Sequence, residues 1–413
     1  MEKIIVLDFG SQYSHLICRR IREFSVYAEL VPYDISPEEL KKMNPKGIIF
    51  SGGPSSVYNE DSPKPNEELF GFDLPLLGIC YGHQLIVNKF GGKVKRANKE
   101  YGSSLLSMDK DSKLLDGIGE SIRAWMSHGD EAEKIPSNFE VIGHTENSHA
   151  AAIANTDRTV FGIQFHPEVV HTERGTDILK NFVLNVCKAK QEWTMEGFVE
   201  KTVKDISEIE GNVLCGVSGG IDSTVAALLI HKAIGNRLTG VFVDNGLLRL
   251  DESKEIEDMF KNNFSLNFHR IDASEQFLSK LKGITDPEQK RKIVGEEFIQ
   301  VFTEFANQNG PFKWLAQGTL YPDVIESGVS KGPAAVIKSH HNVGGLPEWL
   351  NLKILEPLRE LYKDEVRDVA RILGVPEKLL KRHPFPGPGL SVRIMGEITP
   401  SKLEICRKAS KIV

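Results

Sequence analysis

Apolar runs alternate with segments of helical periodicity along the N-terminal part of the chain. Residues 3–10, 47–54 and 75–80 are short apolar runs that predict buried strands, and the first two end in glycine turns. Residues 15–24 and 37–43 carry apolar positions at helical spacing. Strands that alternate with helices predict a largely parallel sheet with helices on its faces.

The pattern changes in the segments that follow. Residues 121–130, 151–154 and 159–168 are richer in the β pattern, so we expect the sheet to gain antiparallel strands. Residues 176–193 have the spacing of an amphipathic helix, which we expect to close this domain.

A second alternation of strands and helices begins after a charged helical segment at residues 195–211. The pattern predicts strands at 212–217, 238–246 and 266–273 and helices at 224–235, 252–264, 296–308 and 363–374. We therefore expect an α/β protein of two domains, residues 1–190 and 212–393, each an open, mainly parallel sheet flanked by helices. Residues 191–211 would contain the linker and a leading helix, and residues 394–413 would begin a further domain.

The length and composition fit this organisation. A chain of 413 residues corresponds to two or three domains, and 40% hydrophobic with 26% charged residues is typical of soluble globular proteins. The net charge of −6 argues against nucleic-acid binding, and no apolar run is long enough to span a membrane. The cysteines form no CxxC pair, which argues against a disulfide framework or a structural zinc site and favours the reducing cytoplasm. They are Cys18, Cys80, Cys187, Cys215 and Cys406.

Cys80 follows a predicted strand, within the sequence Gly78-Ile79-Cys80-Tyr81-Gly82. Small residues two positions to either side permit a tight strand-to-helix turn that exposes the thiol and directs backbone N–H groups at the reaction centre. The amino end of a helix also favours the nucleophilic thiolate. The alternative is a small buried core cysteine, and we accept that interpretation for the other four cysteines.

Two other segments supply partners for Cys80. His166 and Glu168 lie two residues apart at the end of a predicted strand, so their side chains face the same side. The carboxylate would fix the tautomer of the imidazole and leave the second ring nitrogen to take the thiol proton. The backbone N–H groups of Gly53 and Tyr81 would form an oxyanion hole.

Together these residues resemble the class I glutamine amidotransferase family, over about residues 1–190. The family pairs GxCxGxQ with a later HPE, and both motifs are present here in that order. The resemblance implies a flavodoxin-like domain in which Cys80 attacks the side-chain amide of L-glutamine to give a glutamyl thioester and ammonia. It also implies that the glutamine contacts come from Gln84, Ser127, His128 and Asp130.

Residues 218–223, Ser-Gly-Gly-Ile-Asp-Ser, lie between a predicted strand and a predicted helix. Backbone N–H groups at such a helix start bind phosphate. Loops for γ-phosphoryl transfer require a lysine after the glycines, and no lysine follows them here. A loop that holds departing pyrophosphate can instead rely on N–H groups alone. Asp222 would then hold Mg²⁺ against the phosphates. The alternative is a glycine turn in which Asp222 is a helix N-cap.

The SGGxDS string is the signature of the PP-loop ATP pyrophosphatases, and residues 212–393 resemble that family and its Rossmann-like fold. Joined to a triad amidotransferase domain, it resembles the GMP synthetase family, as do residues 242–249, 317–327, 337–347 and 382–390. The resemblance implies that ATP adenylates the C2 oxygen of xanthosine 5′-monophosphate (XMP), and that ammonia displaces AMP to give GMP, with pyrophosphate and glutamate as by-products. It assigns ATP contacts to Ser218, Gly219, Gly220, Ile221, Asp222, Ser223 and Thr224, and Mg²⁺ to Asp222.

Five polar residues are less specific candidates for substrate contacts: Asp323, Lys338, Arg359, Lys381 and His383. The alternative role for Asp323 is the initiation of a turn. The alternative for the other four is a charged side chain in a solvated loop or on the surface. Residues 328–345 have the glycine flanks of a mobile lid. His340 and His341 within it have no further ligands at zinc spacing.

The sequence leaves other functions open. One alternative is another PP-loop amidating enzyme, of the NAD synthetase or tRNA-modifying type. Another is a catalytically idle regulatory protein, against which the intact set of Cys80, His166 and Glu168 argues. The family resemblance implies a homodimer formed through a C-terminal domain that largely follows residue 413. A truncated variant would keep glutamine hydrolysis and ATP binding only.

Overall fold

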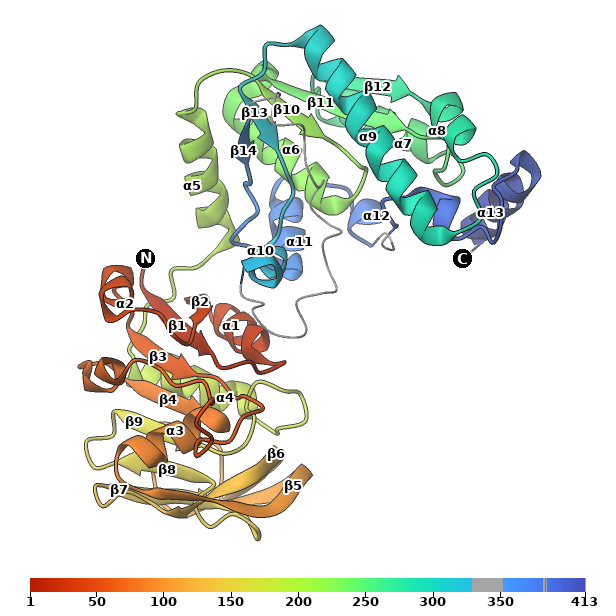
Figure 1. Cartoon of the computed structure of the whole chain (residues 1–413). Helices are drawn as coiled ribbons and strands as arrows, with labels where there is room; N and C mark the ends of the chain where they lie inside the picture. Colours follow the sequence, from red (N-terminus) through yellow and green to blue (C-terminus); the bar gives the residue numbers. More distant parts are fainter. Residues whose placement is uncertain (329–351, 382, 384, 413) are drawn as a thin grey trace. The chain divides into compact units, whose positions relative to one another are not determined.

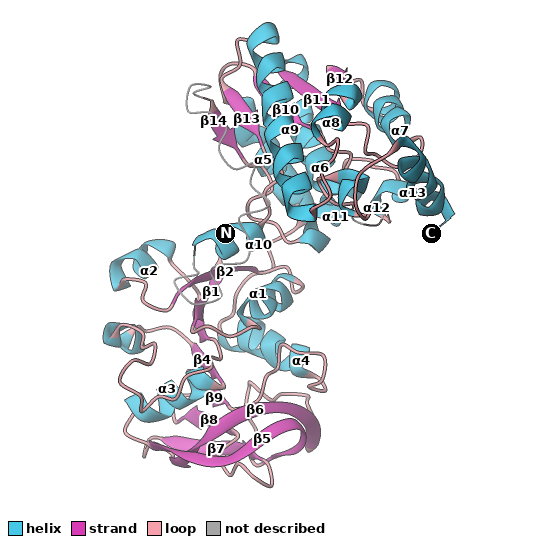
Figure 2. Cartoon of the chain, turned by 45° about the vertical axis from the view of Figure 1, so that its right-hand side comes forward, coloured by secondary structure: helices cyan, strands magenta, loops and turns pink. Residues whose placement is uncertain are grey.

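The computed structural model describes residues 1–328, 352–381, 383 and 385–412. These residues form two compact units that divide between Thr194 and Met195 (Figure 1). Both units have mixed α/β architecture, as Figure 2 shows by its colouring of helices and strands. Among the described residues, no helix has the length and apolar character needed to cross a membrane.

The first unit is built on a nine-stranded sheet with the order β2-β1-β3-β4-β9-β8-β7-β5-β6. Strands from β2 to β9 in this order are parallel, and the pairings beyond β9 are antiparallel, which confirms the predicted mixture. The strands are β1 Lys3–Asp8, β2 Tyr27–Pro32, β3 Gly47–Phe50, β4 Leu76–Ile79, β5 Lys93–Met108, β6 Ser121–Lys134, β7 Phe139–His144, β8 Ala152–Asn155 and β9 Val160–Ile163. Four of the five parallel strands, β1, β3, β4 and β9, carry the apolar runs and are almost fully buried.

The helices of this unit are α1 Ser14–Arg22, α2 Pro37–Met43, α3 Tyr81–Lys89 and α4 Gly175–Lys180. α2 has the bounds expected from its sequence because Ser36 and Glu39 form a capping box and Pro37 begins the helix. The prediction of one helix over residues 176–193 is wrong. α4 continues only as a π-helical turn to Val186, and Lys188 then takes a left-handed conformation that ends it.

His83 of α3 is fully buried against β9, where a Cβ on Gly162 would collide with its ring. Neither ring nitrogen has a hydrogen-bond partner among the described residues. Burial lowers the pKa of His83 to about 3, and the nearby His128 acts in the same direction. The folded chain therefore keeps this imidazole neutral near pH 7.

We expect this buried histidine to make the first unit sensitive to acid. Below pH 6.5 the unfolded chain binds a proton that the folded chain cannot bind, so stability falls as the pH falls from 6.5 toward 3, by about 2 kcal/mol between pH 6.5 and 5. His83→Leu should remove this loss. The loss of stability is measured by urea unfolding of both proteins at pH 7 and pH 5, with hydrogen exchange of the β4 and β9 amides as the probe of the first unit. An equal loss in both proteins would assign the acid sensitivity elsewhere.

The second unit contains a five-stranded, wholly parallel sheet with the order β12-β11-β10-β13-β14. The strands are β10 Val213–Gly216, β11 Leu238–Asp244, β12 Phe268–Asp272, β13 Trp314–Ala316 and β14 Lys353–Leu355. Strand order reverses between β10 and β13, and ligands of such sheets bind at the carboxyl ends of the strands beside this switch point.

Helices pack on both faces of this sheet (Figure 2). The helices of this unit are α5 Met195–Ser207, α6 Ile221–Ile234, α7 Glu252–Asp258, α8 Ser274–Lys280, α9 Pro287–Asn309, α10 Tyr321–Gly328, α11 Lys363–Ile372, α12 Glu377–Leu380 and α13 Pro400–Ile412. α9 is longer than the expected 296–308, because Asp286 caps its start and Pro287 is its first residue.

Lys290 of α9 is fully buried and anchors the chain that leads into α13. Its ammonium donates hydrogen bonds to the carbonyl oxygens of Ser391, Ile394 and Gly396, at 3.2, 2.8 and 2.6 Å. A buried ammonium is tolerated where each of its three N–H groups has an acceptor. This side chain therefore fixes the path of residues 391–396.

Candidate active sites

Cys80 occupies a sharp turn between β4 and α3. Its φ of +53° is a left-handed conformation that a non-glycine residue rarely adopts. Its N–H donates to the carbonyl of Ile163 at 2.8 Å. A Cβ on Gly82 would overlap the backbone of Phe50, and a Cβ on Gly78 would overlap Gly82. The two glycines therefore allow the strand to enter the helix at this cysteine, as the sequence predicts.

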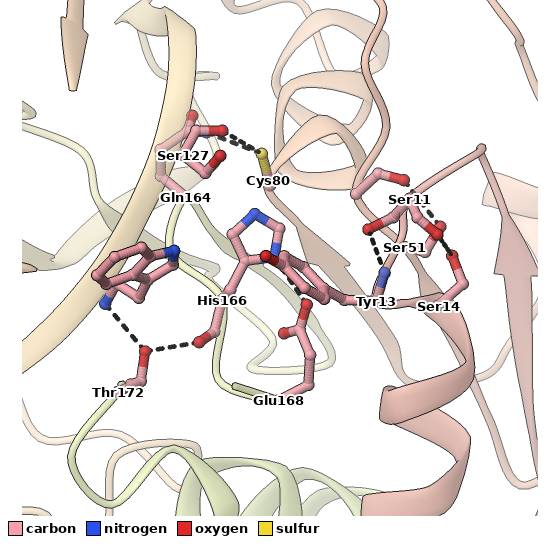
Figure 3. Close-up of polar contacts among 12 residues, drawn as sticks. Ser11, Tyr13, Ser14, Ser51, Cys80, Ser127, Gln164, His166, Glu168 and Thr172 are labelled. Carbon is pink, nitrogen blue, oxygen red and sulfur yellow. Dashed lines mark hydrogen bonds and ion pairs between the residues drawn. The ribbon is translucent and has the colours of Figure 1, made fainter. Parts of the chain in front are cut away.

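The thiol of Cys80 faces β6, β9 and the turn after β3. Its Sγ lies 3.6 Å from the carbonyl oxygen of Ser127 and 3.7 Å from Nε2 of Gln164 (Figure 3). A Cβ on Gly52 would come within 3.1 Å of Cε1 of His166 and 3.6 Å of Cβ of Cys80. Gly52 thus leaves open the space between the thiol and the imidazole.

His166 and Glu168 form a buried pair beside Cys80. Nδ1 of His166 lies 2.7 Å from Oε1 of Glu168, and their side chains are 5% and 0% exposed. Figure 3 shows the imidazole directed toward the sulfur of Cys80. Burial alone would lower the pKa of His166, but the Glu168 carboxylate and Cys80 outweigh it, so the pKa is raised. The carboxylate therefore stabilises the imidazolium that forms when His166 accepts a proton.

The position of His166 is fixed through its backbone. Its N–H donates to the carbonyl of Trp125 at 3.0 Å, and its carbonyl accepts from Thr172 Oγ1 at 2.6 Å. The Tyr13 ring meets the imidazole edge-on, with centroids 5.5 Å apart. These contacts come from β6, from the loop before α4 and from the loop before α1.

Of the expected glutamine contacts, Ser127 touches the thiol, and Gln84 reaches the same region through Gln164. Ser127 presents its carbonyl oxygen to Cys80. Gln84 donates to the carbonyl of Asp130 at 3.0 Å and to Gln164 at 3.4 Å.

The other two expected contacts have protein partners. His128 is buried between Glu100, at 3.1 Å, and the carbonyl of Asp130, at 3.0 Å. The Asp130 carboxylate accepts hydrogen bonds from the hydroxyl groups of Ser56 and Tyr58. The side chains of Gln84, His128 and Asp130 are therefore all buried and hydrogen-bonded within the protein.

The second candidate site is the 218–223 loop, between β10 and α6. Gly219 has a φ of +75°, and Gly220 is the N-cap of α6. The Ser223 hydroxyl accepts from the N–H of Ser218 at 3.1 Å and donates to the carbonyl of Gly220 at 3.1 Å, and the Thr224 hydroxyl donates to the same carbonyl at 2.8 Å. The loop therefore presents the amino end of a 14-residue helix at the carboxyl edge of the sheet, where phosphate groups bind.

A lysine reaches this loop from a distant part of the sequence. Nζ of Lys363, the first residue of α11, lies 2.6 Å from Oδ1 and 2.5 Å from Oδ2 of Asp222. Both side chains remain partly exposed, at 42% and 30%. The sequence motif has no lysine of its own, and the fold brings one to it. Asp222 is therefore an ion-pair partner and does not cap α6 through its side chain.

Comparisons with known proteins cover the whole chain. The glutamine amidotransferase class-I family model matches residues 5–186, and the NAD synthase family model matches residues 193–299. The GMP synthase (glutamine-hydrolysing) of Clostridium tetani is 53% identical over 414 aligned positions, which cover 100% of this chain and 81% of that protein. The corresponding protein of Alkaliphilus metalliredigens is 54% identical, with the same coverage.

The chain belongs to the glutamine-hydrolysing GMP synthase family. Within that family the two units correspond to an amidotransferase part and a PP-loop part. The NAD synthase match covers the 218–223 loop but ends at residue 299, whereas the GMP synthases align through both units.

The remaining residues that we considered as GMP synthase substrate contacts are held differently. Asp323 accepts the N–H of Leu320 at 3.0 Å, and Arg359 pairs with Glu356, three residues earlier. Both contacts are local. They fit the alternatives given above, a turn-initiating role for Asp323 and a surface charge for Arg359. Lys381 is exposed at the end of α12, and His383 offers its carbonyl to Arg249 at 3.0 Å. Lys338, His340 and His341 lie outside the described residues.

Three residues at these sites were not found by sequence reasoning: Gly52, Gln164 and Lys363. Gly52 precedes Gly53 in the SGGP turn, and the sequence does not tell the two glycines apart. Only the structure shows that Gly52 lies against His166. Gln164 lies two residues before His166, in the extended segment that follows β9. Residues two apart in extended chain face the same side, so this spacing could have identified Gln164. Lys363 carried a weaker signal, because a cation at the first position of a helix opposes the helix dipole and so suggests another role.

Proposed function

We propose that the first site hydrolyses glutamine through a thioester on Cys80. His166 takes the thiol proton, and the thiolate attacks the side-chain amide carbon of glutamine. The N–H of Tyr81, a first-turn donor of α3, and that of Gly53 stabilise the oxyanion, and Gln84 and Asp130 hold the rest of the amino acid. His166 then protonates the departing ammonia, and a water molecule that it deprotonates releases glutamate from the thioester.

The second site, on the same proposal, cleaves ATP between its α and β phosphates. The N–H groups of residues 218–223 hold the pyrophosphate, assisted by the positive end of the α6 dipole. Asp222 would supply a hard oxygen ligand for Mg²⁺, since one carboxylate together with substrate phosphates is a usual Mg²⁺ environment. The ion would neutralise charge that develops on the leaving pyrophosphate. Lys363 supplies a second positive charge at the same point.

The two reactions together convert XMP into GMP. The C2 carbonyl oxygen of a purine is a poor leaving group. Transfer of the AMP group of ATP to this oxygen releases pyrophosphate and makes a phosphate ester, from which ammonia then displaces AMP. Ammonia from the first site supplies the amino nitrogen of GMP. The supporting observation is the buried Cys80–His166–Glu168 arrangement in a chain that aligns over its length with glutamine-hydrolysing GMP synthases.

The NAD synthase match to residues 193–299 supports a second candidate, the amidation of a pyridine dinucleotide. A thiolating enzyme has less support, because Cys215, the cysteine next to the loop, is buried in β10. Burial raises the pKa of Cys215 to about 12, so its thiol is not poised for reaction.

The assay that tests the proposal supplies glutamine, Mg-ATP and XMP and follows AMP, pyrophosphate, glutamate and GMP. In parallel, the carboxylic acid precursor of NAD replaces XMP. We expect the four products in equal amounts with XMP, and no amidated product with the dinucleotide. Amidation of the dinucleotide without GMP formation from XMP would overturn the assignment. A reaction without Mg²⁺ would remove the metal role of Asp222.

A further inference from the structure

In the loop that follows β11, residues 245–249, two consecutive backbone N–H groups have acceptors close by in the sequence. The N–H of Gly246 donates to Oδ1 of Asp244 at 3.1 Å, and the N–H of Leu247 donates to Oδ1 of Asn245 at 2.9 Å. Gly246 has a φ of +71°, which favours glycine. These bonds shape the turn but leave its carbonyl groups to find partners elsewhere.

The C-terminal part of the chain supplies those partners. Nη2 of Arg407 donates to the carbonyl of Gly246 at 2.7 Å, the N–H of Leu390 donates to Leu247 at 2.8 Å, and Nε of Arg407 donates to Leu248 at 3.1 Å. Three consecutive carbonyls thus accept from residues more than 140 positions away. Arg407 lies on α13, which Figure 2 draws beside α7, the helix that follows this loop.

The loop lies where the nucleoside of a bound nucleotide is expected. β11 is the direct neighbour of β10, and the parallel pairing places the 245–249 loop and the 218–223 loop at the same edge of the sheet. A nucleotide whose phosphates rest on the 218–223 loop extends its nucleoside along this edge, across the ends of adjacent strands. The conformation of residues 244–248 therefore shapes that part of the pocket.

We propose that Arg407 is a positioning residue for ATP, because its guanidinium holds the 246–248 backbone in the conformation that receives the nucleoside. The inference rests on the proposed use of ATP at the 218–223 loop. It makes the C-terminal helix α13 a contributor to nucleotide affinity in the second unit, although α13 lies far from that loop in the sequence.

Arginine suits this position better than lysine. Its planar guanidinium has separate donors that reach two carbonyls at once, whereas lysine offers one nitrogen. The same side chain lines a pocket of about 250 Å³ together with Asp244, Arg249, Glu252 and Arg270. Because Arg407 borders this open pocket, its truncation removes two hydrogen bonds without leaving a sealed cavity.

The test is the ATP dependence of pyrophosphate release in the full chain with Arg407→Ala. We expect KM for ATP to rise about tenfold, kcat to change less than twofold, and glutamine hydrolysis in the absence of ATP to stay unchanged. Arg407→Lys should give an intermediate KM. Lys408→Ala is the matched control, since Lys408 lies on the same helix, is 68% exposed and pairs with Glu404.

The outcomes separate this inference from the proposed function. If the unsubstituted protein releases no pyrophosphate from ATP, the proposed function fails first. If it does, and Arg407→Ala has an unchanged KM for ATP, the positioning role is wrong. A fall in thermal stability without any change in KM in both Arg407→Ala and Arg407→Lys would also overturn it, because it would assign Arg407 to folding alone.

Discussion

Replacement of Cys80 by alanine is expected to abolish glutamine-dependent GMP formation while GMP formation from added ammonium salts continues. The thiol is the proposed nucleophile, and its loss removes the thioester step, so glutamine hydrolysis should fall by about 10⁴ or more. The second unit has its own sheet and core and does not depend on this side chain. Glutamate release, and GMP formation with glutamine or ammonium chloride as nitrogen source, measure the two effects.

Cys187→Ala provides the matched control for this experiment. Cys187 is buried against Gly47, and burial raises the pKa of its thiol, so it is not expected to react. This variant should hydrolyse glutamine at the normal rate. Glutamine hydrolysis that survives in Cys80→Ala would show that the nucleophile is misassigned.

Replacement of Asp222 by alanine is expected to have the reverse effect. Removal of the carboxylate at the start of α6 takes away the proposed Mg²⁺ ligand and the ion-pair partner of Lys363. We expect pyrophosphate release to fall by roughly 10²–10³, because electrostatic stabilisation of the leaving group is lost. Glutamine hydrolysis without ATP should be retained. Measurement of pyrophosphate and glutamate in the same samples separates the two sites.

Asp368→Ala serves as the control for charge. Asp368 lies on α11, the helix that begins with Lys363, but its side chain is 57% exposed and pairs with Arg371. Its loss changes the net charge by the same amount and should leave both activities intact. Normal pyrophosphate release by Asp222→Ala would separate this residue from the ATP reaction.

The elements that the sequence predicts well have signals confined to a few neighbouring residues. α2 is marked by its own capping box, and the buried strands β1, β3 and β4 are marked by unbroken apolar runs. The turn at Cys80 was predictable for the same reason, since the glycines that permit it lie two positions away. The 218–223 loop likewise carries its glycines and its helix start in one short string.

Other features depend on contacts between distant residues. Lys363 meets Asp222 across 141 positions, and His128 is drawn to Glu100 by a strand pairing that no local pattern specifies. The helix expected over 176–193 ends early although its apolar spacing continues. The last part of this segment is not helical and packs against β2, where the centroid of the Trp193 ring lies 4.8 Å from that of the Tyr27 ring. In this last segment tertiary packing overrides the local helical preference.

The buried ammonium of Lys290 sets a limit on the chain that surrounds it. Its three acceptors come from residues 391, 394 and 396, so an insertion or deletion within this stretch would carry at least one oxygen out of reach. The number of residues between these acceptors is therefore constrained. Acylation of the amine would remove its charge and leave one N–H donor for three carbonyl acceptors, so the folded protein disfavours this modification at Lys290.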